Sequence, residues 1–116
     1  MGAGQHRSEN GDTSALDEAL GGYPTIRAAA KMLGVAPSTL SRRGDLQSEV
    51  RGDRDRVLRV REVLRLAAIY RRRALNDVAQ SLVMNARRAS VDDATRVENE
   101  VEAFFETVAA GRGVAV

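Results

Sequence analysis

Residues 25–43, TIRAAAKMLGVAPSTLSRR, predict two short helices that meet at a sharp corner. Thr25 can cap the first turn of the first helix. The apolar residues after it recur at i, i+3, i+4 and i+7, on one helical face: Ile26, Ala29, Ala30 and Leu33. Gly34 can end this helix because glycine adopts positive φ without a Cβ clash. Pro37 suits the first position of the second helix, where its missing N–H is not needed.

The second helix has one large apolar residue, Leu40, which we expect to point back at the first helix. The outward face would then carry hydroxyl and guanidinium groups: Ser38, Thr39, Ser41, Arg42 and Arg43. Such a helix suits the major groove of duplex DNA, where base edges and phosphates offer hydrogen-bond acceptors. These five residues are the candidate base contacts, and Arg42 is the leading candidate to bind guanine.

The same stretch resembles the helix-turn-helix of bacterial transcription regulators, with Ala30, Gly34 and Val35 at matching positions. Its wider context is GVAPSTLSRRGDL, an arginine-rich hairpin candidate, the helix RVREVLRLAAIYRRR and then ALNDVAQSLV. This order is similar to the winged helix-turn-helix group of MerR-like and excisionase-like proteins, over residues 23–83. The resemblance implies a mainly all-α fold with a small β-hairpin wing, and binding to double-stranded DNA.

The segment after Gly44 has two interpretations. Strand candidates at 47–51 and 56–60 flank the turn-forming tetrad GDRD, which predicts a hairpin that presents arginines to phosphates: Arg51, Arg54 and Arg56. The competing interpretation is one long helix from Asp53, because Val57, Val60, Leu64 and Ala67 also share a helical face. The resemblance favours the hairpin. Arg27 and Lys31 complete the candidate phosphate contacts.

Two further helices are predicted over 60–73 and 75–89. The first is expected to direct five arginines to solvent: Arg61, Arg65, Arg71, Arg72 and Arg73. The last three can interact favourably with the negative end of the helix dipole or contact phosphates, and both roles remain open.

A C-terminal amphipathic helix begins at Ser90, which forms a capping box with Asp93. Its apolar residues step by three and four, the spacing of a coiled-coil seam. They make a candidate interface with a second copy or another protein: Val97, Val101, Phe104, Phe105 and Val108. The alternative is an ordinary helix folded onto its own domain.

Length and composition predict one small domain. The 116 residues include two Phe, two Tyr and no Trp, so the core must be aliphatic, which favours packed helices. We expect a disordered leader (1–12), a DNA-binding domain (13–89) that opens with a short helix through Leu20, a dimerisation or partner helix (90–110) and a flexible tail (111–116). No apolar run approaches the roughly twenty residues that span a bilayer, and a cytoplasmic, nucleoid-associated protein is expected.

Charge is distributed unevenly along the chain. Residues 27–88 contain 15 basic and 6 acidic residues, a net charge of +9, whereas residues 1–24 carry −3 and residues 91–116 carry −4. A basic centre between acidic ends predicts a polyanion-binding surface.

Side chains for catalysis are missing from the pattern. The chain has no Cys, and its one imidazole, His6, lies in the leader. Neither a phosphate-binding glycine loop nor paired-His spacing occurs. We expect no enzyme activity, no cofactor and no metal.

The leading hypothesis is therefore a dimeric, sequence-specific DNA-binding regulator of transcription, such as a repressor. An alternative is an antitoxin, which would bind DNA with its basic half and a basic protein toxin with its acidic C-terminal helix. A third is an excisionase-type factor that binds DNA in tandem and bends it.

Overall fold

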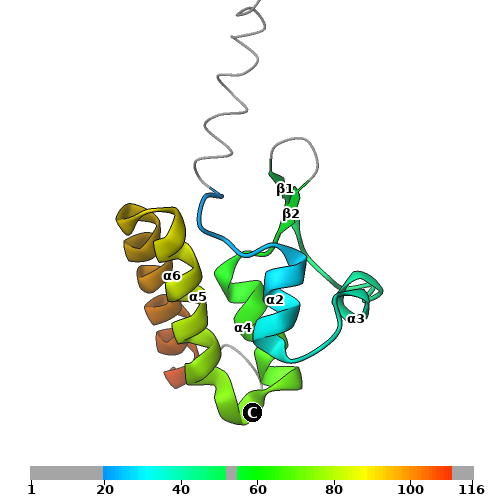
Figure 1. Cartoon of the computed structure of the whole chain (residues 1–116). Helices are drawn as coiled ribbons and strands as arrows, with labels where there is room; N and C mark the ends of the chain where they lie inside the picture. Colours follow the sequence, from blue (N-terminus) through cyan, green and yellow to red (C-terminus); the bar gives the residue numbers. More distant parts are fainter. Residues whose placement is uncertain (1–19, 52–54, 111–116) are drawn as a thin grey trace, which may run out of the picture.

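The structure, a computed structural model, describes residues 20–51 and 55–110 (Figure 1). In chain order its elements are α2 (Ile26–Leu33), α3 (Pro37–Ser41), β1 (Glu49–Arg51), β2 (Asp55–Val57), α4 (Val60–Tyr70), the 3-10 turn η1 (Arg72–Ala74), α5 (Leu75–Ala89) and α6 (Val91–Ala109). The expected leader with the helix after it, the hairpin tip and the tail lie outside the described residues. The mainly helical fold with one small hairpin is confirmed.

Helix α2 begins and ends as its capping residues predict, whereas α3 begins at Pro37 as expected but ends earlier, at Ser41. The Thr25 hydroxyl accepts a hydrogen bond from the Ala28 amide, with Oγ1 and N 3.1 Å apart. Gly34 ends α2 with φ of 72°, and the Val35 amide donates to the Ala30 carbonyl across the corner. Leu40 is completely buried and attaches α3 to the core. The rest of α3 projects to one side of the molecule (Figure 1).

A two-stranded antiparallel hairpin follows α3, in the register Glu49 to Val57 and Arg51 to Asp55. The alternative of one long helix from residue 53 is therefore wrong. The second strand also differs from its expected range, because Asp55 pairs with Arg51 instead of turning. The strand ends at Val57, after which the Leu58 amide donates to the Pro24 carbonyl at 2.9 Å. This bond ties the hairpin to the start of α2.

Helix α4 is shorter than its apolar pattern predicts. It ends at Tyr70 because Arg71 leaves helical geometry, with φ of −142° and ψ of 51°. The Arg71 guanidinium donates to the Met32 carbonyl at 2.9 Å, so it satisfies an open carbonyl of α2. The Arg71 side chain is exposed as expected, and its guanidinium also binds the end of α2.

The core forms where α2, α4, α5 and α6 meet, and it is aliphatic as expected. Its fully buried large side chains include Leu33, Leu64, Leu82 and Val97. Tyr23 is the one aromatic side chain among the buried residues of the described core. Helix α6 lies along α5 (Figure 1) and is capped by Ser90, whose hydroxyl accepts from the Asp93 amide at 2.9 Å. The predicted capping box is thus confirmed on its serine side.

Candidate nucleic-acid interface

The outward face of α3 carries polar side chains that the fold leaves available. Ser38, Thr39 and Arg42 are exposed, and none of their side chains has a hydrogen-bond or ion-pair partner among the described residues. Ser41 is also exposed, but its hydroxyl donates to the Pro37 carbonyl at 2.9 Å. Ser41 could therefore act toward a ligand only as an acceptor, whereas the other three can donate.

Arg43 differs from these four residues because its side chain turns inward and is only 24% exposed. Its guanidinium forms two bonds to the Asp45 carboxylate, of 2.8 and 3.0 Å. It also donates to the Tyr70 hydroxyl at 2.8 Å and lies 5.5 Å from the centre of that ring. The expectation that Arg43 lies on the outward face is not met, since these partners hold it against α4.

A polar network continues from Arg43 and fixes the loop between α3 and the hairpin. Arg65 contacts the Asp45 carboxylate at 3.2 Å and the Glu62 carboxylate at 2.8 Å. Glu62 is buried, and it also accepts the Gln47 amide at 3.0 Å. The hydrogen bond from Arg43, with the charges of both arginines, lowers the pKa of Asp45 to about 2. Sequence reasoning missed this network; its one local signal is the i, i+3 spacing of Glu62 and Arg65.

The hairpin arginines have intramolecular partners of their own. Arg51 pairs with Asp55 across the strands at 3.4 Å. Arg56 is exposed and donates to the Ser48 hydroxyl at 2.6 Å, while Arg59 pairs with Glu49 at 3.0 Å. The two ion pairs lie at the surface, where the Arg51 and Arg59 side chains are 29% and 46% exposed, so exchanging them for phosphate costs little. Arg54 lies outside the described residues.

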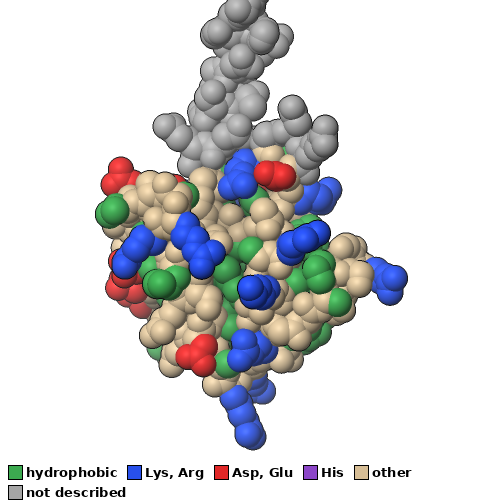
Figure 2. Space-filling model, viewed as in Figure 1, with side chains coloured by type: hydrophobic (Ala, Val, Ile, Leu, Met, Phe, Trp, Pro, Cys, Tyr) green, Lys and Arg blue, Asp and Glu red, His purple; other side chains and the backbone are tan. Residues whose placement is uncertain are grey.

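Exposed cations gather on the face formed by α2, α3 and α5, whereas carboxylates gather at the edge where α6 lies (Figure 2). Both remaining candidates for phosphate binding, Arg27 and Lys31, are exposed on α2 with no partner in the part of the chain described. The charge asymmetry of the sequence is thus also an asymmetry in space.

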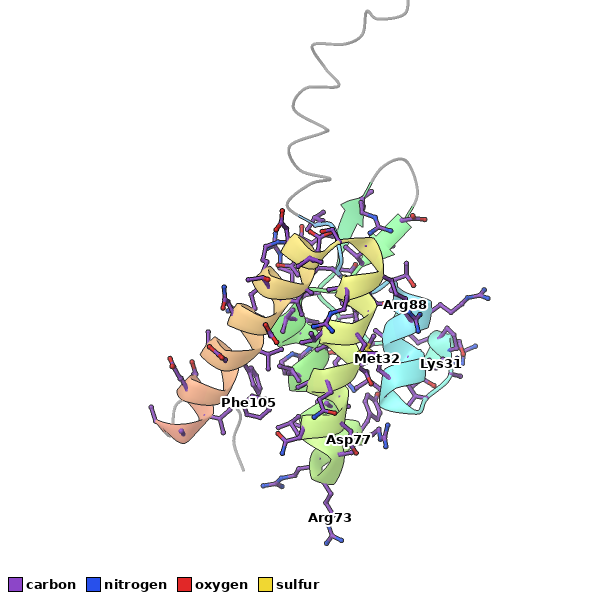
Figure 3. All side chains as sticks on the ribbon, turned by 60° about the vertical axis from the view of Figure 1, so that its left-hand side comes forward. Lys31, Met32, Arg73, Asp77, Arg88 and Phe105 are labelled. Atoms are coloured by element: carbon purple, nitrogen blue, oxygen red, sulfur yellow. The ribbon has the colours of Figure 1, made fainter. Side chains whose placement is uncertain are left out.

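The candidate interface residues of α6 differ from one another in exposure. Val97 is fully buried in the chain's own core, so it is closed to a partner while α6 is docked. Val101, Phe104, Phe105 and Val108 are half-buried, and Phe105 points from α6 toward the neighbouring helices (Figure 3).

The first half of α6 is also held by polar contacts to the segment before α2. The Tyr23 hydroxyl donates to the Glu100 carboxylate. Arg96 donates to the Gly21 carbonyl and to Asp93, and its guanidinium lies 5.0 Å from the centre of the Tyr23 ring. The Asn85 amide of α5 donates to the Gly22 carbonyl at 3.1 Å. Burial and the bond to Glu100 raise the pKa of Tyr23.

No protein-family model, curated protein or solved structure matches this chain. Within residues 20–51 and 55–110, no helix is long and apolar enough to cross a membrane. No cluster of three or more His, Asp or Glu side chains in the same ranges could hold a metal ion. What the exposed face offers is hydrogen-bond donors and positive charge.

Proposed function

We propose that the protein is a sequence-specific double-stranded DNA-binding regulator of transcription. The observation that supports this most is the geometry of α3. Leu40 and the inward-facing Arg43 hold the helix from behind, while Ser38, Thr39 and Arg42 are exposed in front with no partner among the described residues. A short helix fixed in this way presents donors at defined positions, as reading of base edges in a major groove requires.

The exposed cations divide into base-reading and backbone-holding groups in this proposal. Arg42 can donate two hydrogen bonds to guanine, which is worth about 1–3 kcal/mol of discrimination against another base. Arg27 and Lys31 on α2, with Arg51 and Arg56 on the hairpin, would hold phosphates on either side. Phosphate contacts fix the position of the protein on the duplex but carry no sequence information.

Two copies are needed for useful specificity, because the five residues of α3 can cover only a few base pairs. The half-buried residues at the end of α6 are the surface that we propose for pairing: Val101, Phe104, Phe105 and Val108. A two-fold dimer would bind half-sites separated by one or two turns of DNA, about 34–36 Å for each turn.

A pair of substitutions tests which arginine contacts a base and which contacts a phosphate. Arg42→Ala should relax sequence preference, because the lost contact reads a base. Arg56→Ala should weaken binding to operator and random duplexes by the same factor and lower the salt slope by about 1, because the lost contact holds a phosphate. The measurement is fluorescence anisotropy on both duplexes across a salt series. If the Arg42→Ala variant keeps the operator preference of the wild-type chain, the proposal that α3 reads bases is wrong.

The surface of α6 favours an antitoxin as the second candidate. Four of its carboxylates are exposed and have no partner within the described chain: Asp92, Glu98, Glu102 and Glu106. They accompany the half-buried apolar residues, a combination that suits a basic protein partner. Co-purification from the native host separates the candidates. A stoichiometric basic partner supports the antitoxin, and a lone symmetric dimer supports the regulator.

A further inference from the structure

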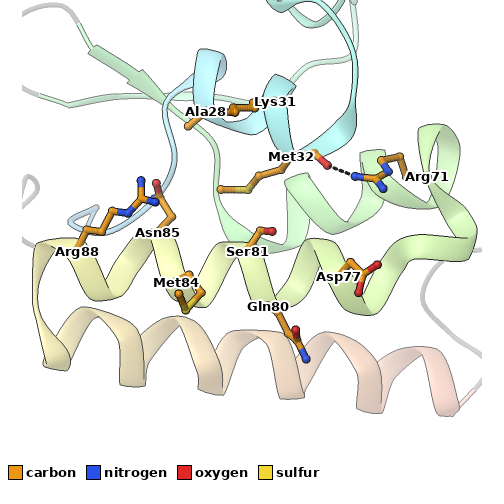
Figure 4. Close-up of a pocket in the computed structure, with 10 residues that line it drawn as sticks. All are labelled: Ala28, Lys31, Met32, Arg71, Asp77, Gln80, Ser81, Met84, Asn85 and Arg88. Carbon is orange, nitrogen blue, oxygen red and sulfur yellow. Dashed lines mark hydrogen bonds between the residues drawn. The ribbon is translucent and has the colours of Figure 1, made fainter.

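An open groove of about 540 Å³ lies between α2 and α5, and no residue of α3 lines it (Figure 4). Ala28, Lys31 and Met32 of α2 line one side, and Ser81, Met84 and Arg88 of α5 line the other. Figure 3 shows Lys31 and Arg88 at the same side of the molecule. The two helices thus form a channel whose walls bear a cation on each side.

The charge of the groove is mostly positive. Lys31 and Arg88 are exposed and have no partner among the described residues. Arg71, at the end of α4, uses one guanidinium nitrogen on the Met32 carbonyl and directs the rest of its side chain toward the groove (Figure 4). Asp77 is the one carboxylate in the lining and has no ion-pair partner there. Three cations against one carboxylate favour an anion.

Several neutral groups could bind the same anion. Ser81 and Gln80 of α5 both line the groove and are exposed, and the Ser81 side chain points toward α2 (Figure 4), so its hydroxyl can donate to an oxygen there. Met84 is 57% exposed and gives the wall an apolar part. Donors of this kind beside Arg and Lys are typical of surfaces that hold phosphate and sugar.

We propose that this groove holds the DNA phosphate backbone beside the segment contacted by α3. The inference rests on the proposed function and extends it to a third element. In a helix-turn-helix complex the first helix crosses the backbone while the second lies in the major groove. Here α2 is the first helix, and the groove runs along it. Phosphates that pass α2 would therefore meet Arg88 of α5 as well as Lys31, which adds sequence-independent affinity from outside α3 and the hairpin.

The adjacent arginines Arg87 and Arg88 offer a matched control. Both are exposed on the last turn of α5, but Arg88 lines the groove and Arg87 does not. Arg88→Ala should lower the slope of log binding constant against log salt by about 0.9, the effect of one phosphate contact. Arg87→Ala should leave the slope unchanged. Operator preference should be the same in both variants, because neither residue reads a base.

Methylphosphonate substitutions in the duplex can show which backbone position contacts the groove. Operator duplexes that carry one methylphosphonate, an uncharged backbone unit, should bind the wild-type chain less well at the position that faces the groove. The Arg88→Ala variant should be insensitive to the change at that position and remain sensitive to those at the hairpin. The Lys31→Ala variant should lose sensitivity at the same or the neighbouring unit.

The outcomes separate this inference from the function on which it rests. If the Arg87→Ala and Arg88→Ala variants have equal salt slopes and both still prefer the operator, the groove does not bind the DNA backbone. The proposed DNA-binding function would still stand. The groove could instead bind inorganic phosphate without DNA, in a way that depends on Arg88, while the two variants keep equal salt slopes for DNA binding. That result would assign the groove to a free anion and would also contradict the proposed backbone contact. A wild-type chain that binds no duplex at low salt would overturn both proposals.

Discussion

Gly22 occupies a position that only glycine suits. Its φ is 84°, and a Cβ atom built there would lie 2.8 Å from the Cβ atom of Asp93. Gly22→Ala should therefore destabilise the fold by more than about 1 kcal/mol, which lowers the melting temperature by roughly 4–8 °C for each kcal/mol. Gly44 is the control, because it has open space around it and no positive φ. Gly44→Ala should be neutral or slightly stabilising in the same thermal scan.

Asp45 makes stability depend on pH. Its hydrogen bond to Arg43 lowers its pKa from 3.8 to about 2 in the folded protein. A lowered pKa adds stability above the unfolded value, and this stability is lost as pH falls through the folded value. Urea midpoints should therefore show the wild-type chain more stable than Asp45→Asn at neutral pH, with the gap narrowing between about pH 4 and pH 2. A gap that stays constant over that range would contradict the ion pair.

At the residue scale, local chemistry was predictable and distant contacts were not. Thr25, Gly34, Pro37 and Ser90 act at helix ends through neighbours within a few residues, so sequence alone assigned them. Arg43 was expected on the outward face because Tyr70, which holds it against α4, lies 27 residues away in the chain, although its other partner, Asp45, is only two residues away. No spacing rule connects such positions, and only the fold brings them together.

Helix α6 shows how one element can be part core and part surface. Its seam spacing predicted an interface, but Val97 is buried in the chain's own core while Val108 is half-buried. Val97→Ala should lower the free energy of unfolding by about 2 kcal/mol, because apolar burial is lost and a cavity is left. Val108→Ala should cost much less in unfolding of the monomer. Denaturation in urea at low protein concentration measures both.

The same pair tests the pairing surface. If α6 joins two copies, Val108→Ala should weaken the dimer in sedimentation experiments at concentrations where the monomer stays folded. If Val97→Ala and Val108→Ala lower the free energy of unfolding of the monomer equally, and neither affects association, then the whole of α6 packs on its own domain. Periodicity alone could not decide this, since a helix has the same pattern whether it packs on its own domain or on a partner.

Elements were also predicted more reliably than their ends. The predicted helix extended to Arg73, because neither Gly nor Pro follows Tyr70 to mark an earlier end. The helix stops because Arg71 turns to the Met32 carbonyl, a contact between segments 39 residues apart. The hairpin was favoured by resemblance, whereas its anchor, the bond from Leu58 to Pro24, had no signal in the sequence.

For the whole molecule, charge gave the clearest prediction from sequence. The positive centre and the acidic last helix became two sides of the structure, with cations over α2, α3 and α5 (Figure 2). The groove between α2 and α5 was not predictable, because its walls come from segments about 50 residues apart. A duplex that contacts α3, the hairpin and this groove would neutralise many charges, so affinity should fall steeply with salt.

The central claim is that the exposed face of α3 reads duplex DNA. Its most direct test is to select binding fragments from the genome of the native host and to titrate the wild-type chain on the best fragment and on a random duplex at moderate salt. We expect preference for the selected site on the order of a thousandfold or more. Equal affinity for the selected and random duplexes would contradict it.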